Sequence, residues 1–174
     1  QLKFTQVYHQ IKYRLVKPKR ATIPREGEFA QVDLFGFPEK QKSLSICKNV
    51  WSFSYLNLEH SFSKGSLDWS FGDYGMLWTY NLNYFDWLHQ PGFSKEQGLE
   101  TLSQFYATTA ENNPIIVHPY PTSLRIINVA KFISKWDTKE DWLYNEMVSD
   151  LEFLSRRLEY HLLANHLLEN AFAL

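Results

Sequence analysis

Three polar residues near the C-terminal end of the sequence have side chains that can take part in proton chemistry. Asn165, His166 and Glu169 lie close together in the stretch EYHLLANHLLENAFAL (159–174). Asn165 offers a carboxamide donor and His166 a ring that titrates near neutral pH. Glu169 offers a carboxylate that could orient an imidazole or share a proton. These residue types make the three side chains candidates for a catalytic site.

The stretch 159–174 has the periodicity of a mostly buried helix, in which the polar residues fall on two thin strips. An unpaired buried polar group costs roughly 1 to 3 kcal/mol, so each of these groups needs a partner. Either they form a structural network, or one strip lines a cavity that receives a polar ligand. Periodicity alone favours the network. The two strips are His161, Asn165 and Glu169, and Glu159, His166 and Asn170.

Composition excludes several classes of protein. The 174 residues are 44% hydrophobic, which predicts a folded domain with a core. Because 18 basic residues nearly balance 19 acidic ones, we expect no nucleic-acid partner. Cys47 is the single cysteine, and the sequence lacks the Cys/His spacing typical of zinc sites, so we expect neither a metal nor a cofactor. No apolar run is long enough to predict a membrane span.

The first part of the chain, 1–50, predicts an arm of mixed structure. An amphipathic pattern indicates a short helix around Val7 to Leu15, and a strand is expected at 29–34. A basic run, Lys17, Lys19 and Arg20, could touch an anionic polymer, although a solvated charge run is the simpler interpretation.

The remainder, 51–174, predicts mostly helices. Alternating aromatic residues indicate a strand at 51–58, with Glu59 and His60 in a surface turn or loop. Helical periodicity and helix-ending residues predict helices at 76–88, 94–109 and 122–136, and then a long helical region, 139–174, with a bend at Arg156 and Arg157. The expected fold is therefore mainly α, with antiparallel helices behind the mixed arm.

A second group of residues could line a pocket beside the catalytic candidates. Aromatic residues make up 17% of the chain, and their flat faces suit both core packing and sugar rings. An arginine in the first turn of an apolar helix needs a buried carboxylate or an anionic ligand, so an internal salt bridge is an equal alternative for it. The candidate substrate-binding residues are Tyr80, Asn83, Tyr84, Tyr120 and Arg125.

Four motifs resemble the N-terminal part of heparinase II/III-like proteins, a group of polysaccharide lyases and their relatives. They are LNLEHSF (56–62), LWTYNLNYFDWL (77–88), YPTSLRIIN (120–128) and EYHLLANHLLENAFAL (159–174). The resemblance implies that residues 51–174 are the first part of an incomplete (α/α) toroid. Consistent with this, the sequence stops in an apolar helix without a cap, so we expect a fragment whose partner is the remainder of its own chain beyond Leu174.

The resemblance also implies a reaction, β-elimination at a uronic acid of a heparin-like, heparan-sulfate-like or related acidic polysaccharide. In the family's Gly-Asn-His pattern the asparagine binds and neutralises the substrate carboxylate, and it matches Asn165, followed by His166. Ala164 stands where the pattern usually has glycine. The family's catalytic tyrosine and a further histidine come later than the asparagine and would lie beyond Leu174, so the fragment alone is expected to be inactive.

Two other functions stay open at this stage. A glycoside hydrolase needs two opposed carboxylates, and Glu159 and Glu169 fall on different strips of the predicted helix, which counts against it. A non-catalytic glycan-binding or scaffolding module in polysaccharide biosynthesis would keep the aromatic residues without needing His166 as a base. A degradative lyase would favour a periplasmic or secreted location, and a cytoplasmic one stays open.

Overall fold

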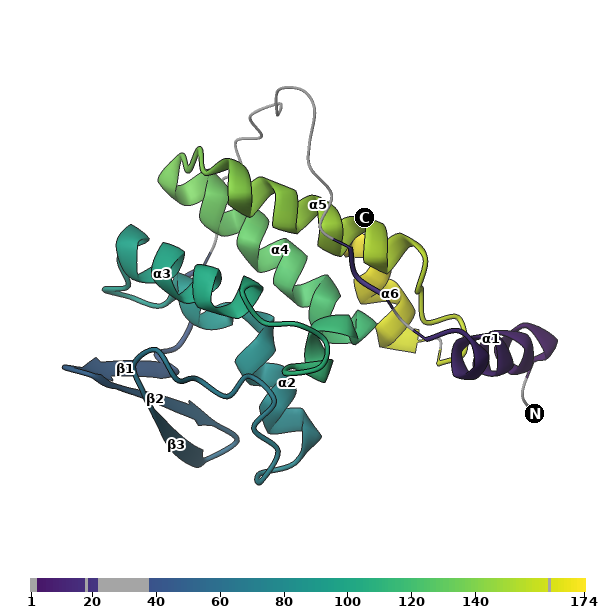
Figure 1. Ribbon diagram of the computed structural model, residues 1–174, viewed down its shortest axis with the longest axis horizontal. Coiled ribbons are helices and arrows are strands. Elements are labelled where there is room, and N and C mark those ends of the chain that lie inside the picture. The colour runs from purple at the N-terminus through teal and green to yellow at the C-terminus, as the bar shows by residue number, and fades with distance from the viewer. Residues whose placement is uncertain (1–2, 18, 22–37, 163) are drawn as a thin grey trace.

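A computed structural model describes residues 3–17, 19–21, 38–162 and 164–174 (Figure 1). These residues form a three-stranded antiparallel sheet with the order β1-β2-β3, six α-helices and two short 3-10 helices. In chain order the elements are α1 (Phe4–Leu15), β1 (Leu44–Cys47), β2 (Val50–Tyr55), β3 (Leu58–Ser63), α2 (Met76–Tyr84), η1 (Asp86–His89), α3 (Lys95–Tyr106), η2 (Pro114–Val117), α4 (Pro119–Trp136), α5 (Asp141–Ser155) and α6 (Ala164–Ala173). The strand expected at 29–34 lies outside the described residues.

The fold is mixed α/β, and the expected mainly α toroid is wrong. The alternation in 51–58 correctly predicts β2, but β2 pairs with a strand on either side. Leu56 and Asn57, at φ 56° and 63°, form the tight turn before β3, so Glu59 and His60 lie in a strand rather than a turn. The sequence does not predict this hairpin because its turn contains no glycine. The sheet also contains strands from both sides of residue 50, the boundary expected between the arm (1–50) and the rest of the chain (51–174).

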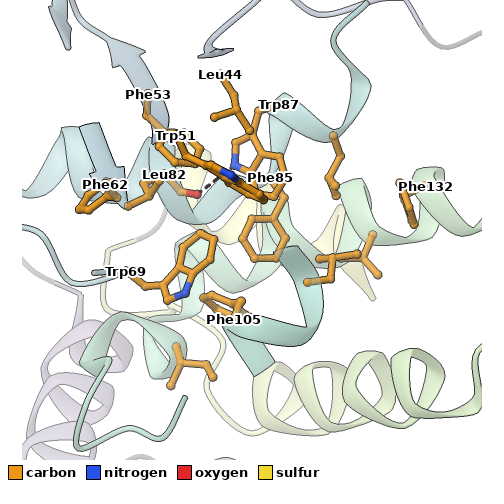
Figure 2. Packing of buried hydrophobic residues seen from close by; sticks show 14 of the residues in the cluster. Leu44, Trp51, Phe53, Phe62, Trp69, Leu82, Phe85, Trp87, Phe105 and Phe132 are labelled. Carbon is orange, nitrogen blue, oxygen red and sulfur yellow. Dashed lines mark hydrogen bonds between the residues drawn. The ribbon is translucent and has the colours of Figure 1, made fainter. Parts of the chain in front are cut away.

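The sheet packs its apolar face on α2 and η1 and so forms the main core (Figure 2). Trp51 and Phe53 of β2 are buried together with Trp87, whose indole N–H donates a 3.2 Å hydrogen bond to the Leu82 carbonyl. At the other side of the core α3 lies so close to α4 that a Cβ at Gly98 would fall 2.3 Å from the Phe132 ring. Helices α3 and α4 are therefore held close together in this core.

Local sequence signals correctly predict that α2, α3 and α4 exist, but the ends of α2 and α4 differ from those expected. Ser94 caps α3 as expected, because its hydroxyl accepts from the Gln97 N–H while the Gln97 side chain accepts from the Ser94 N–H. The helix predicted at 76–88 ends early, since Phe85 takes a left-handed conformation and η1 follows. The helix predicted at 122–136 begins one turn earlier, at Pro119.

The long helical region predicted for 139–174 is divided, and this changes the position of several polar residues. The expected bend at Arg156 and Arg157 is the end of α5, and α6 begins only at Ala164. Between them, backbone groups find partners outside a helix: the Leu158 carbonyl accepts from the Tyr13 hydroxyl, and the Glu159 N–H donates to the Asn170 side chain. Glu159 and His161 are therefore not on the helix that carries Asn165.

A buried ionic cluster ties the N-terminal part of the chain to the helices. Asp150 on α5 accepts from Arg125 on α4, at 2.8 Å and 3.0 Å, and from Arg20, at 2.6 Å. Burial alone would raise the pKa of Asp150, but the two guanidinium groups together lower it. Arg20 also donates to Glu146. The cluster joins α4, α5 and the segment after α1 at one point.

No helix among residues 3–17, 19–21, 38–162 and 164–174 is both long and apolar enough to cross a membrane.

We expect the Asp150→Asn variant to lose about 3 to 5 kcal/mol of unfolding free energy, because it leaves the buried Arg125 guanidinium without a carboxylate and removes one of the two carboxylates that pair with Arg20. Urea unfolding followed by far-ultraviolet circular dichroism measures the loss. Asp73→Asn, at an exposed position, is the control and should change stability by less than about 0.5 kcal/mol. A similar small loss for both variants would contradict the role given to the cluster.

His89 on η1 should make folding pH-dependent. Its ring is buried and its Nε2 donates to the Asn128 carbonyl over 3.0 Å, and burial lowers the pKa of His89 to about 4. Between that value and the unfolded pKa of about 6.5, only the unfolded chain takes up the proton, so stability falls as pH falls through this window. The unfolding free energy should be lower at pH 4.5 than at pH 7. His89→Gln, which keeps a hydrogen-bond donor, should reduce this difference by about 2 kcal/mol. Equal pH dependence in both proteins would contradict this assignment.

Candidate functional site

Three helices bring the candidate residues together. Tyr80 and Tyr84 are one turn apart on α2, and Tyr120 is in the first turn of α4. Asn165 and His166 are in the first turn of α6, which packs along α4 (Figure 1). The rings of Tyr84 and Tyr120 are 5.9 Å apart, and those of Tyr120 and His166 are 4.3 Å apart. Residues from distant parts of the sequence thus form one continuous cluster.

Glu159 holds the imidazole of His166. Nδ1 of His166 lies 3.3 Å from Oε1 of Glu159, a residue that is only 5% exposed. The second oxygen of Glu159 accepts from the Asn170 side chain over 3.2 Å, and Asn170 also donates to Ser123 on α4. Burial raises the pKa of Glu159, while His166 and Asn170 oppose that rise. With Nδ1 engaged, the Nε2 atom of His166 is the one left for a ligand.

Asn165 and Tyr120 form the neighbouring part of the site. Asn165 is exposed, Tyr120 is half-buried, and the Asn165 side chain acts to lower the pKa of the Tyr120 phenol. Burial raises the pKa of Tyr120, as do the negative charges of Glu169 and Glu159. The phenol therefore keeps its proton at neutral pH, beside a carboxamide donor and an imidazole.

Tyr80 and His118 form a second pair that sequence reasoning missed. The Tyr80 hydroxyl lies 2.9 Å from Nδ1 of His118, the residue that precedes α4. Burial lowers the pKa of His118 and raises that of Tyr80, so a neutral phenol and a neutral imidazole share this hydrogen bond. The apolar, proline-stiffened sequence IIVHPYP (115–121) was a signal that this loop is held in place.

The structure assigns the orienting carboxylate differently from the sequence reading. Glu169 was expected to orient an imidazole or share a proton, but the carboxylate at His166 is Glu159. Glu169 is half-buried, and its charge contributes to the raised pKa of Tyr84 and Tyr120, after burial. Asn170 belongs to a buried network, as the periodicity favoured. His161 faces α1 instead, with its ring 5.4 Å from that of Tyr13.

Two of the candidate substrate-binding residues lie elsewhere. Arg125 is fully buried and pairs with Asp150, which is the internal salt bridge left open by the sequence. Asn83 is also fully buried, and its amide donates to the Trp69 and Thr79 carbonyls. Neither side chain reaches the cluster around His166. Asn83 therefore belongs to the core, whereas Tyr80 and Tyr84 on the same helix belong to the site.

The part of the chain that the structure describes contains no group of three or more His, Cys, Asp or Glu side chains placed to hold a metal ion. Comparisons with protein-family models, curated proteins and solved structures gave no match for this chain.

Ala164, at the start of α6, takes a backbone conformation that favours glycine. Its φ is 52°, in the left-handed region where a Cβ is disfavoured by about 1 kcal/mol. This is the position where the heparinase-like pattern usually has glycine.

We expect Ala164→Gly to raise the unfolding free energy by about 0.5 to 1 kcal/mol, because glycine relieves the strain of a left-handed φ. Ala171→Gly, on the exposed side of the same helix, should lower it by about 1 kcal/mol. Urea denaturation of the two variants measures both changes. Opposite signs support the strain at Ala164, and equal losses would contradict it.

Proposed function

We propose that this chain supplies part of the catalytic site of a polysaccharide lyase, which cleaves a uronic-acid-containing glycan of the heparin or heparan-sulfate type, or a related acidic glycan, by β-elimination. The observation that carries the proposal is the meeting of Asn165, His166 and Tyr120, with Glu159 behind the imidazole. A carboxamide, an imidazole and a protonated phenol are the groups that this reaction uses.

Each group has a place in the elimination. Asn165 is exposed and can donate to the C6 carboxylate of the uronate, which stabilises the negative charge that develops there. Nε2 of His166 takes the C5 proton, and the electrons of that C–H bond form the C4=C5 double bond. The bond from C4 to the glycosidic oxygen breaks, and the oxygen leaves with the electron pair and takes up a proton.

The proton donor for the leaving oxygen is proposed to be a phenol. Tyr120 is beside His166 and remains protonated, because burial and two carboxylates raise its pKa. In the heparinase-like proteins that the sequence resembles, a further tyrosine and histidine come later in the chain than the asparagine, and we propose that such residues would complete the site. Tyr80, hydrogen-bonded to His118, is proposed to contact the sugar ring.

The geometry argues against a glycoside hydrolase for a reason that the sequence did not provide. Glu159 is not on α6, so the argument from two strips of one helix does not hold. Both oxygens of Glu159 are engaged, however, by His166 and Asn170, and its carboxylate is buried. A carboxylate whose two oxygens are occupied in this way presents neither of them to a glycosidic bond. A non-catalytic glycan-binding module is the alternative that experiment must separate from the lyase.

The test is the ultraviolet absorbance of the unsaturated uronate, assayed with heparin, heparan sulfate, chondroitin sulfate, hyaluronan and alginate. The 174-residue chain and the longest natural protein that contains it are assayed in parallel. We expect Asn165→Ala to lower kcat by about 10²- to 10³-fold, the usual loss of one donor to a developing oxyanion.

Asn112→Ala, in an exposed loop, is the matched control and should leave kcat unchanged. Equal rates for Asn165→Ala and the unaltered protein would exclude the proposed role of Asn165. If neither the 174-residue chain nor the longer natural protein forms a double bond in any polymer, but one of the polymers still binds, the glycan-binding module replaces the lyase as the proposed function.

A further inference from the structure

A basic groove lies apart from the site, between α1 and the connection that follows α5. It has a volume of about 730 Å³ and lies where α1 meets the body of the molecule, at the end opposite the sheet (Figure 1). Five cationic side chains line it, and no acidic residue is among the described residues that do so. The five are Lys12, Lys17, Lys19, Arg156 and Arg157.

Three of these cations are available to a ligand. Lys12, Lys17 and Lys19 are exposed, and none of them pairs with a carboxylate within the part of the chain that the structure describes. Arg156 pairs with Glu152 at the end of α5, and Arg157 donates to the Val16 carbonyl, so Arg157 also links the two walls of the groove. In a chain of net charge −1, this is a local concentration of positive charge.

The groove and the candidate site share one segment of backbone. Leu158 and Tyr160 line the groove, whereas Glu159, between them, reaches His166 and Asn170 on the other side. Tyr13 of α1 holds this segment through its hydrogen bond to the Leu158 carbonyl, 2.7 Å long. A polymer in the groove would therefore lie next to the segment that carries Glu159.

We propose that this groove binds an anionic stretch of the polysaccharide, away from the bond that is cleaved, through its carboxylate or sulfate groups. The inference rests on the proposed function, and it deepens it by requiring a substrate that carries negative charge on several consecutive sugars. Lysine ammonium groups on flexible stems suit such a ligand, because they can follow charges at variable spacing.

The aromatic rings of the groove argue against a nucleic acid. Base stacking needs a free ring face, but the Tyr13 ring has the Arg157 guanidinium over it at 5.0 Å and packs in a T-shaped arrangement with the His161 ring. His9 and Tyr160 pack against each other at 4.8 Å. A concave groove also does not match the flat surface of a lipid bilayer.

The test compares binding of size-defined heparin oligosaccharides to two triple variants by isothermal titration calorimetry. Lys12→Gln/Lys17→Gln/Lys19→Gln removes the available groove cations. Lys48→Gln/Lys64→Gln/Lys139→Gln removes three exposed lysines elsewhere and so changes net charge equally. We expect the groove variant to bind about tenfold more weakly, as three solvent-exposed ion pairs imply, and the control less than about twofold more weakly.

The same two variants and Asn165→Ala are also assayed for double-bond formation, and the unaltered protein is titrated with oligothymidylate and with vesicles containing phosphatidylglycerol. Normal heparin binding by the groove variant overturns the groove, even if Asn165→Ala has lost activity and the lyase stands. Groove-dependent binding of heparin without double-bond formation by any protein supports the groove while the lyase fails. Groove-dependent binding of oligothymidylate or vesicles, with none of heparin, overturns the proposal.

Discussion

The structure depends first on the buried carboxylate of Asp150, which is shared by two arginines. Asp150, Arg20 and Arg125 come from three separate segments, and each would be strongly destabilising alone in the interior. Because the three charges are stable only together, the cluster fixes the position of α5 relative to α4 and draws in the segment after α1. The chain on either side of the cluster then has little freedom: α5 must end near the N-terminal helix, and α6 must return along α4.

That arrangement explains why the candidate site forms where it does. The connection after α5 is held by Tyr13 on one side and by Asn170 on the other, so Glu159 is presented to His166 from outside the helix that carries the imidazole. Tyr120 and Ser123 come from α4, whose position the Asp150 cluster sets through Arg125. The site is thus built on the same helices that the buried charges hold in place.

Sequence reasoning recovered the parts of this structure that depend on local signals. Ser94 marks a helix start, and the alternation of Trp51 and Phe53 marks a strand, because caps and periodicity act over a few residues. β1 and β3 were missed because a turn such as Leu56 and Asn57 lacks glycine. A bend at Arg156 and Arg157 was expected, but the non-helical connection that follows it was missed, because the leucine pattern continues through it while partners from α1 and α6 take over its backbone groups. In the site, Tyr80, Tyr84, Tyr120, Asn165 and His166 were all named, but the pairing of Glu159 with His166 is a long-range contact that no spacing shows.

The way in which α1 is attached has a consequence for any ligand of the groove. None of its residues is buried, and its described polar contacts to the body are few: Gln6 to the His161 carbonyl, Tyr13 to the Leu158 carbonyl, and the Arg157 contact at Val16 just after its end. A helix held in this way can open at a small free energy, well below that of global unfolding. The groove exists only while α1 is docked, so its apparent affinity is the intrinsic affinity multiplied by the docked fraction. A polyanion that contacts both walls would in turn stabilise the docked state of α1 and reduce the motion of the backbone around Glu159. Binding of the ligand and docking of the N-terminal helix would then favour each other.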